Sequence, residues 1–271
     1  MSALSVTLIT YNEENKIADA LESVKWADEI VVVDSFSTDR TLEICKRYTD
    51  KVYQIPWQGY VVQKNLALEK ASHEWILNLD ADERVSPELA EEIKRALQTD
   101  EFDGYYIPRR VFYLGTWIRY AGWYPDYKLR LFKKSLARWE GPGIHEKVVL
   151  KGRVGYLKGD LYHFSYDNLA HHVNKINQFT TIAAEQIRKP VRGHTIFLRA
   201  LFAFFKKYFL KRAFLEGTRG LIISGMSAFQ VFIKYAKMWE LSQNPKGHGD
   251  TKPWELGKID KAREQEDLER Q

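Results

Sequence analysis

Hydrophobic and polar positions alternate in blocks along the first hundred residues, and these blocks predict strands followed by helices. Three runs, Leu4–Thr10, Glu29–Asp34 and Trp75–Asp80, are apolar and rich in β-branched residues, which is typical of strands buried on both faces. Lys51–Ile55 predicts a shorter strand. The stretches between the strands carry apolar residues at helical spacing. The pattern therefore predicts an α/β fold, with a mostly parallel sheet flanked by helices.

The long predicted strands end in polar side chains. The first ends at Thr10, the second at Asp34 and the third at Asp80, which is followed by Asp82. In an open α/β sheet the carboxyl ends of the strands form the edge where ligands bind. Two carboxylates one residue apart suit Mg²⁺ or Mn²⁺, which use few carboxylates together with substrate phosphates. An acidic turn is the alternative, because aspartate is a favoured turn residue.

The turn after the first strand, residues 10–14, contains no glycine. The glycine-rich fingerprint of dinucleotide-binding folds is therefore absent, and so is the phosphate-binding Walker loop. Phosphates would need a metal instead, and Asp80 and Asp82 are placed to bind one.

Four short motifs follow one another in the first hundred residues: Leu8–Glu13, Val31–Asp39, Gln63–Asn65 and Leu79–Asp82. In this order the chain resembles inverting family-2 glycosyltransferases, which have the GT-A fold. Two later segments, Gly122–Phe132 and Gly143–Glu146, are similar to a bacterial subgroup that adds sugars to the lipopolysaccharide core, often a glucose onto a heptose. The resemblance implies an enzyme that transfers a hexose from a UDP-sugar to an inner-core sugar such as heptose. Glucose is the first candidate for this hexose.

The resemblance also implies roles for residues that bind the nucleotide. Thr10, Tyr11 and Glu13 would line the base and ribose, since a carboxylate accepts hydrogen bonds from hydroxyl or N–H groups. Asp34 would accept a hydrogen bond from the uracil imide, and the resemblance favours UDP over GDP. Two alternatives stay open: Glu13 can complement the dipole of the following helix, and Asp34 can be a turn aspartate.

Five further residues are assigned to the diphosphate and the metal. Asp82 would bind the divalent metal, Mn²⁺ or Mg²⁺, and Asp80 would either lie nearer the ribose or support the metal site without touching the metal. Lys64 would neutralise phosphate or hold the region around Asp80, with a solvated helix lysine as its alternative. His145 follows a glycine-rich loop and would contact the metal or the diphosphate. Arg130 would reach the diphosphate from an alternating run.

Inverting transfer is a single displacement, and it needs a base that deprotonates the acceptor hydroxyl. A carboxylate serves by analogy with inverting glycosidases. Asp126 is the first candidate, because Pro125 fixes its approach and its aromatic neighbours suit a sugar; a turn aspartate is the alternative. Glu146 is the second candidate. Beyond it, Leu150–Phe164 predicts a short strand pair, with His163 facing the site.

Composition changes after the segment Lys189–Gly193. Ile196–Arg212 mixes phenylalanine and leucine with lysine and arginine and has no acid. Its charges are too frequent for a membrane span, which needs about 20 apolar residues. The segment predicts a basic amphipathic helix on an anionic membrane surface; core or oligomer helices are the alternative. The expected division is a catalytic domain over 1–165, a helical region over 166–240 and a polar charged tail over 241–271.

Charge and cysteine content refine this prediction. The chain has 271 residues and a formal net charge of +5. Much of the excess lies in the helical region, so the charge favours a membrane surface over nucleic acid. The one cysteine, Cys45, excludes a disulfide framework and fits a reducing compartment. With no secretory signal expected at the N-terminus, the predicted location is cytoplasmic, peripheral on the inner face of the cytoplasmic membrane.

Other functions stay open at this point. A nucleic-acid-binding protein would explain the mixture of aromatic and basic residues over Tyr105–Tyr127, but not the acidic strand ends. The acceptor of a glycosyltransferase can also be another lipid-linked saccharide or a surface polysaccharide. A catalytically silent membrane-associated scaffold of the same fold is a further alternative, because a fold does not prove an activity.

Overall fold

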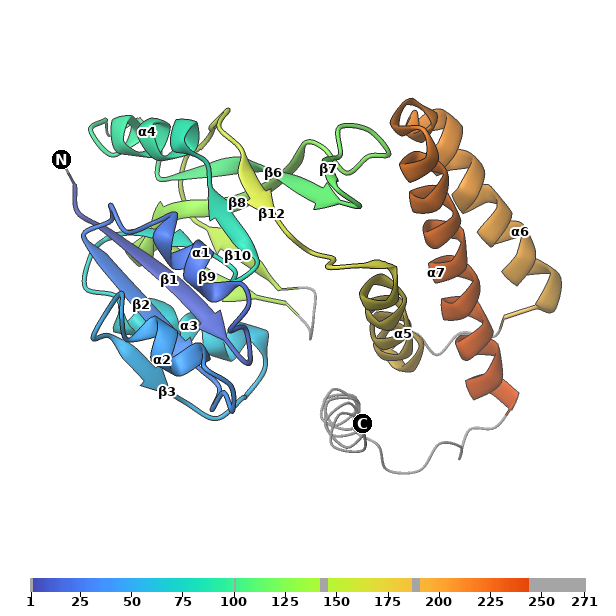
Figure 1. Ribbon diagram of the computed structural model, residues 1–271, viewed down its shortest axis with the longest axis horizontal. Helices are drawn as coiled ribbons and strands as arrows, with labels where there is room; N and C mark the ends of the chain where they lie inside the picture. Colours follow the sequence, from blue (N-terminus) through green and yellow to red (C-terminus); the bar gives the residue numbers. More distant parts are fainter. Residues whose placement is uncertain (1, 100, 142–145, 187–190, 244–271) are drawn as a thin grey trace. The chain divides into compact units, whose positions relative to one another are not determined.

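The computed structural model describes residues 2–99, 101–141, 146–186 and 191–243 (Figure 1). The chain divides into two compact units. The first comprises Met1–Arg119 and Trp123–Ser165, and the second comprises Tyr120–Gly122 together with the chain from Tyr166 onward. Most of the segment expected as a polar tail, residues 244–271, lies outside the described residues.

The first unit is built of strands and short helices that alternate along the chain. Its elements are β1 (Leu4–Thr10), α1 (Ile17–Glu22), β2 (Glu29–Asp34), α2 (Thr41–Cys45), β3 (Val52–Gln54), α3 (Tyr60–Lys70), β4 (Trp75–Asn78), β5 (Glu83–Val85), α4 (Pro87–Ala96), β6 (Gly104–Tyr113), β7 (Thr116–Trp117), β8 (Asp126–Lys133), η1 (Lys134–Leu136), β9 (Ala137–Glu140), β10 (Lys147–Leu150), β11 (Val154–Tyr156) and β12 (Leu161–His163).

Among the described residues, ten strands form one sheet in the order β3-β2-β1-β4-β8-β6-β12-β5, with β7 and β11 also paired to β6. The first four strands of this order are parallel. Beyond them β8 runs antiparallel to β4, and β6 runs antiparallel to β8. Strands β9 and β10 form a separate antiparallel pair. The parallel half matches the expected arrangement, and the other half is mixed.

The parallel half brings the predicted polar residues to one edge. Thr10 lies opposite Asp34 in the register of β1 and β2, and Thr7 lies opposite Asn78 in the register of β1 and β4. Strand β1 has β2 on one side and β4 on the other, so the strand order reverses beside it. This reversal is where an α/β sheet opens a crevice for a ligand at its carboxyl edge.

Both faces of the central strands are covered by apolar side chains. Val32 and Leu77 belong to one core cluster, whereas their neighbours Val31 and Ile76 belong to the other. Because successive side chains of a strand point to opposite faces, two cores require a continuous apolar run rather than an alternating one. Burying such a side chain contributes about 1.5–3 kcal/mol, which fixes the strands that carry the site.

The second unit is helical. It contains α5 (Leu169–Gln186), α6 (Gly193–Phe205), the π-helical turn η2 (Lys206–Leu210), the 3₁₀ turn η3 (Ala213–Glu216) and α7 (Thr218–Gln243). Helix α7 packs against both α5 and α6. Within the described part of the chain, we find no helix whose length and apolar content would let it cross a membrane.

Several sequence-based expectations differ from the structure, and the strand expected over Trp75–Asp80 ends at Asn78. The strand pair predicted within Leu150–Phe164 is wrong, because β11 and β12 each pair in parallel with β6 instead of with one another. The single helix predicted over Ile196–Arg212 ends at Phe205, and a π-helical turn follows it. Strands of three residues are too short to carry a pattern that identifies their partner.

Candidate active site

Asp80 follows β4 and is surrounded by cations. Its Oδ1 lies 3.1 Å from Nζ of Lys64, and its Oδ2 accepts a hydrogen bond from Arg130. Its backbone N–H donates to Oε2 of Glu83 at 3.0 Å. Burial by itself would raise the pKa of the Asp80 carboxyl, but Arg130 and Lys64 outweigh burial and hold this pKa well below its usual range. Asp80 is therefore ionised and held in place by both cations.

Lys64 connects Asp80 to a second carboxylate. Its ammonium lies 3.0 Å from Oε1 of Glu146 and 4.4 Å from the centre of the Trp139 ring. The Lys64 side chain is only 3% exposed, so its charge needs these partners in place of water. Helix α3 thus supplies a buried cation that holds Asp80 and Glu146 on either side of it.

Arg130 extends the network on the opposite side of Asp80. From β8 it donates to Oδ1 of Asn78 and to Oε1 of Glu83, both at 2.7 Å. Glu83 is fully buried and also lies 3.4 Å from Arg109. Burial would lower the pKa of the Arg130 guanidinium, but Asp80 and Glu83 raise it. Arg130 therefore stays charged, with its donors directed at the end of β4.

Arg109 joins this network to the predicted base. It donates to Oδ2 of Asp126 through Nε at 3.1 Å and through Nη2 at 2.7 Å. Lys128 lies 3.0 Å from the other carboxylate oxygen. Burial would raise the pKa of Asp126, but Arg109 and Lys128 lower it. The alternating charges run in the order Glu146, Lys64, Asp80, Arg130, Glu83, Arg109, Asp126 and Lys128.

Asp82 has a different environment from Asp80. Its Oδ2 lies 3.2 Å from Nε2 of His163, and its carbonyl oxygen accepts a hydrogen bond from the Phe164 backbone at 2.8 Å. Strand β12 brings His163 here because it pairs with β5, where His163 lies opposite Glu83. His163 thus faces the site, as its position in the sequence predicts.

Asp82 and His163 offer one carboxylate and one imidazole to a metal. Among the described residues, no three His, Cys, Asp or Glu side chains are grouped to hold a metal by themselves. Mg²⁺-type sites use one or two carboxylates and complete their coordination with substrate phosphates and water. Asp82 and His163 fit this kind of site, whereas both oxygens of Asp80 are already paired with cations. His145 lies outside the described residues.

The predicted nucleotide residues lie at the ends of β1 and β2. Asp34 is fully buried and accepts hydrogen bonds from the backbone and hydroxyl of Ser37 and from Gln54. Thr10 is buried as well, and its hydroxyl has no hydrogen-bond partner in the described part of the chain. Tyr11 is 42% exposed next to it. Glu13 donates its backbone N–H to the Thr41 hydroxyl at 2.7 Å, where α2 begins.

The residues that flank Lys64 form hydrogen bonds to the loops and strands around the site. Gln63 is fully buried and donates to the Ser35 hydroxyl at 3.0 Å and to the Pro56 carbonyl at 3.0 Å. Asn65 binds both backbone groups of Trp139, accepting from its N–H at 3.0 Å and donating to its carbonyl at 3.1 Å. The motif over 63–65 therefore fixes the loop after β2, the buried cation and the strand β9 at once.

Several members of the network were missed by the sequence reasoning. Asn78, Glu83 and Arg109 carry no motif of their own, although Glu83 directly follows the Asp80–Asp82 pair. Tyr60 is another: burial raises the pKa of its phenol, and the carboxylates of Glu146 and Asp80 raise it further. Pairing between strands brings Asn78, Glu83 and Arg109 to the site, and Tyr60 reaches it from the start of α3; local sequence does not specify either arrangement.

A family model described as "Glycosyl transferase family 2" matches residues 5–149, which is more than half of the chain. The chain belongs to glycosyl transferase family 2. One relative is a glycosyltransferase of Rickettsia typhi, 35% identical over 259 residues, covering 89% of this chain and 88% of the relative. Another is the lipopolysaccharide core biosynthesis glycosyltransferase LpsC of Rhizobium meliloti, 32% identical over 254 residues, covering 88% of this chain and 92% of LpsC.

Among solved structures, TarS residues 1–349 of S. aureus in complex with UDP-GlcNAc is similar with a TM-score of 0.48 and 18% identity, covering 91% of this chain and 93% of that structure. A glucosyl-3-phosphoglycerate synthase of Mycobacterium tuberculosis, solved with Mn²⁺, UDP-glucose and phosphoglyceric acid, has a TM-score of 0.36 and 22% identity, covering 40% and 44%. Family membership and the observed sheet together identify this glycosyltransferase as a mixed α/β protein of GT-A type.

Proposed function

We propose that this glycosyltransferase transfers a hexose, glucose in the first instance, with inversion from a UDP-sugar to a hydroxyl of a saccharide. As acceptor we propose an inner-core sugar of lipopolysaccharide, such as heptose. The relative LpsC, whose name states a role in lipopolysaccharide core biosynthesis, supports this acceptor through 32% identity along most of both chains. The observation that carries the proposal is Asp82 beside His163 at the carboxyl edge of the sheet.

The donor would bind across the ends of β1, β2 and β4. Thr10, Tyr11, Glu13 and Asp34 would contact the base and ribose. The buried Thr10 hydroxyl supports this, because an unpaired buried polar group favours a ligand that satisfies it. Strand order reverses at the same place, which is where nucleotides bind in folds of this class.

Asp82 and His163 would hold Mn²⁺ or Mg²⁺, with His145 as a further ligand. A divalent cation bound there offsets the negative charge that develops on the leaving diphosphate. Lys64 and Arg130 would act on this region through Asp80, since both are buried and paired with its carboxylate. Together they keep the turn after β4 rigid, so that Asp82 has one position.

Asp126 would serve as the base, with Glu146 as the second candidate. The acceptor oxygen bonds to the anomeric carbon while the bond to the diphosphate breaks, and its proton passes to the carboxylate. Arg109 and Lys128 lower the pKa of Asp126, so it is ionised and ready to accept. The hydroxyl loses its proton only as its oxygen becomes bonded to carbon, so a carboxylate of low basicity suffices.

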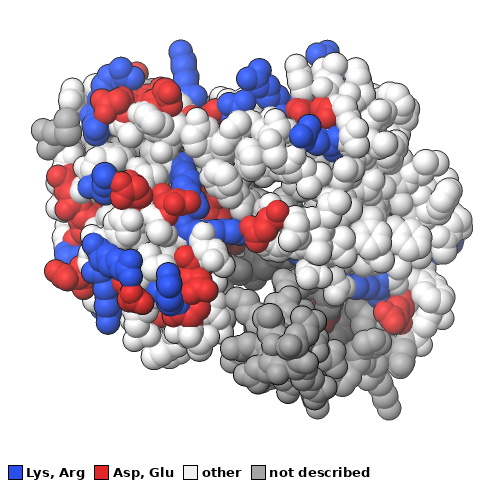
Figure 2. All heavy atoms as spheres, viewed as in Figure 1, with Lys and Arg blue, Asp and Glu red and all other residues white. Residues whose placement is uncertain are grey.

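The helical unit would attach the enzyme to the inner face of the cytoplasmic membrane. Val191–Leu215 has six basic residues and no acid. Phe197, Leu198 and Phe202 of α6 are each about 60% exposed. On the face drawn in Figure 2, uncharged spheres predominate over α6 and α7, while both signs of charge are interspersed over the strand-and-helix unit. Apolar and basic side chains on one helix suit an anionic interface.

Calorimetric titration with UDP, GDP and their glucose and mannose adducts, with and without Mn²⁺, tests the donor site. We expect UDP and UDP-glucose to bind in a metal-dependent way. Asp82→Asn should weaken metal-dependent binding about tenfold or more, because it removes the one carboxylate of the proposed ligand pair. The exposed Asp50 is outside the network, so Asp50→Asn is the matched control and should bind UDP normally.

Two results would count against the proposal. If folded protein binds none of these nucleotides, the silent-scaffold alternative takes its place. If UDP binds equally well without metal and in Asp82→Asn, the metal site is wrong while the donor site stands. A transfer assay with UDP-glucose and heptose-containing core saccharide, compared with other lipid-linked saccharides, then tests the acceptor.

A further inference from the structure

The helical unit contains a cavity of about 320 Å³, and the residues that line it include none of the proposed catalytic residues. It lies where η2 and the end of α6 face α7, and the short segment Tyr120–Gly122 belongs to the same unit. Its lining residues are Gly122, Ala203, Lys206, Lys207, Lys211, Ser227, Gln230 and Val231.

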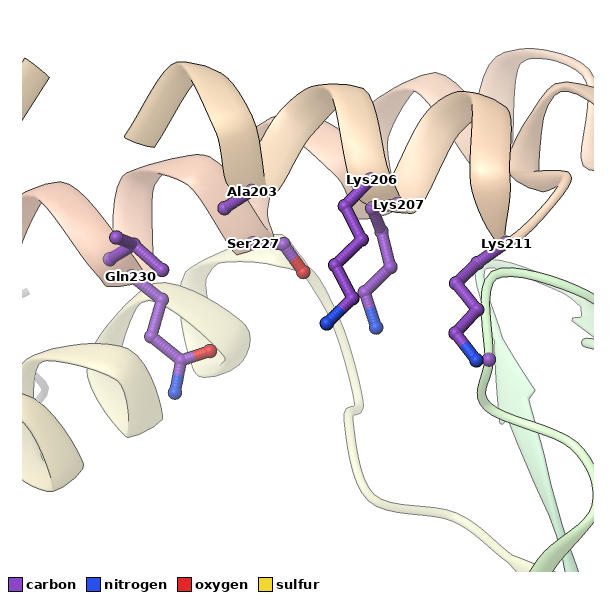
Figure 3. A pocket seen from close by; sticks show the side chains of 8 residues that line it. Ala203, Lys206, Lys207, Lys211, Ser227 and Gln230 are labelled. Carbon is purple, nitrogen blue, oxygen red and sulfur yellow. The ribbon is translucent and has the colours of Figure 1, made fainter. Parts of the chain in front are cut away.

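Three lysine side chains extend to the same side of the helix at this cavity (Figure 3). The π-helical turn explains their arrangement, because the backbone N–H of Lys211 donates to the carbonyl of Lys206 at 2.9 Å. In an α-helix, residues five apart do not share a face, whereas an i→i+5 turn brings them into line. The turn thus adds Lys206 to the pair of Lys207 and Lys211.

The described residues that line the cavity leave its positive charge unbalanced. The described lining residues include no acid, and none of the three ammonium groups forms an ion pair within the described part of the chain. Burial lowers the pKa of Lys207, and repulsion from Lys211 and Lys206 lowers it further. Ser227 and Gln230 add a hydroxyl and an amide, which can donate hydrogen bonds to an anion.

The surroundings indicate what carries the anion. Phe202, Phe205, Phe209 and Leu210 lie on the same helix and turn as the lysines and are between 48% and 62% exposed. A soluble phosphate would gain nothing from these side chains. A lipid would, because its acyl region covers apolar side chains while its headgroup reaches the basic residues.

We propose that this pocket binds the phosphate group of an anionic membrane lipid. The inference rests on the proposed attachment to the membrane and adds a discrete headgroup site to it. Lys206, Lys207 and Lys211 would neutralise the phosphate, and Ser227 and Gln230 would hydrogen-bond to it. The exposed aromatic and leucine side chains would enter the interface around it.

Sedimentation of the full chain with phosphatidylcholine vesicles, with and without phosphatidic acid, tests this site. We expect binding that requires phosphatidic acid. A basic residue near an anionic surface contributes about fivefold to binding, so Lys234→Gln, on α7 outside the pocket lining, should cost about that much. Lys207→Gln should cost well over tenfold, because it removes a ligand of the phosphate itself.

Gln230→Glu provides a variant that does not remove a lysine. The new carboxylate would pair with the lysines, so we expect loss of vesicle binding together with an unchanged or higher Tm. Gln230 is exposed, so the substitution leaves the helix packing intact. If Gln230 had only a structural role, a loss of vesicle binding in Gln230→Glu would be accompanied by a lower Tm.

The other outcomes overturn the inference in distinguishable ways. Equal losses in Lys207→Gln and Lys234→Gln would show diffuse electrostatic attachment: the membrane proposal would stand and the pocket would not. Vesicles that fail to bind wild-type protein would refute both. In that case, Tm shifts with inorganic phosphate that disappear in Gln230→Glu would identify a site for a soluble phosphate instead of a lipid.

Discussion

At the scale of single residues, two aspartates separated by a single residue have different surroundings. Asp80 has a buried cation on each carboxylate oxygen, whereas a carboxylate oxygen of Asp82 lies 3.2 Å from the imidazole of His163. Removing one member of a buried ion pair leaves its partner uncompensated. Asp80 therefore belongs to the support of the site, and we propose Asp82 as the member of the pair that binds the metal.

The choice between Asp126 and Glu146 as base can be made by substitution. We expect Asp126→Asn to lower kcat about 10²- to 10⁴-fold, which is the usual contribution of a general base, and to leave the Kd for UDP nearly unchanged. Glu146→Gln should instead reduce stability, because the buried Lys64 loses one of its two carboxylates. Transfer rates, UDP titration and urea unfolding of both variants separate the two effects.

The pH profile adds a check on the base. Because the pKa of Asp126 lies below its ordinary value, this carboxylate stays ionised where a free aspartate, with a pKa of about 3.9, begins to protonate. The loss of rate that comes from protonating Asp126 should therefore begin at a lower pH than an aspartate with the ordinary pKa would give. The assignment reverses if Glu146→Gln abolishes transfer in a stable protein while Asp126→Asn remains active.

At the scale of elements, Glu29 at the start of β2 accepts hydrogen bonds from residues of three neighbouring segments. Burial by itself would raise the pKa of Glu29, but hydrogen bonds from Lys51, Ser5 and Ser72 lower it to about 2 from an ordinary value of 4.5. A carboxyl whose pKa is lower in the folded than in the unfolded state stabilises the folded state. Its contribution is complete when the pH lies above the pKa that the carboxyl has in the unfolded state. This stability is lost as the pH falls from about 4.5 towards 2.

We therefore expect wild-type protein to lose more stability than Glu29→Gln between pH 5 and pH 3. The full contribution of Glu29 is about 3 kcal/mol at most, and part of it disappears in this interval. Urea unfolding of both proteins at several pH values measures the difference. Glu69→Gln, at the exposed end of α3, is the control and should follow the wild type; parallel curves for all three proteins would contradict the prediction.

Elements with strong local signals were predictable from sequence. Strand β1 has the expected bounds Leu4–Thr10, and β2 has the expected bounds Glu29–Asp34. Helix α4 begins where predicted, because the Ser86 side chain accepts from the Leu89 backbone and Pro87 occupies the first turn. In each case the residues that determine the element lie within it or next to it.

Elements whose partners are distant in sequence were not predictable in this way. Strand β12 lies between β6 and β5, and only that position brings His163 to Asp82. Glu83 meets Arg109 and Arg130 because β8, which carries Arg130, pairs with β4, and β6, which carries Arg109, pairs with β8. The π-helical turn that begins at Lys206 likewise interrupts a segment for which the sequence predicts a single helix. Local patterns cannot specify these contacts.

At the scale of the whole molecule, two units of different character share one chain. The first has a two-sided apolar core and a network of alternating charges. The second exposes phenylalanine and leucine on α6 and η2. It also contains the cavity lined by Lys206, Lys207 and Lys211. We infer that the first binds the nucleotide and the second holds the enzyme at its membrane, where a lipid-linked acceptor is found.

This division predicts different effects of two truncations. A chain ending at Ser165 retains the sheet and every described residue of the charge network, so we expect it to bind UDP within about threefold of the full chain. It should lose vesicle binding completely, because the apolar and basic helices are gone.

A chain ending at Gln243 keeps these helices and is the matched control that should bind both UDP and vesicles. Calorimetry and vesicle sedimentation of both truncated proteins give the answer. Vesicle binding that persists in the shorter chain would place membrane attachment in the first unit, and its loss in the longer chain would place it beyond residue 243.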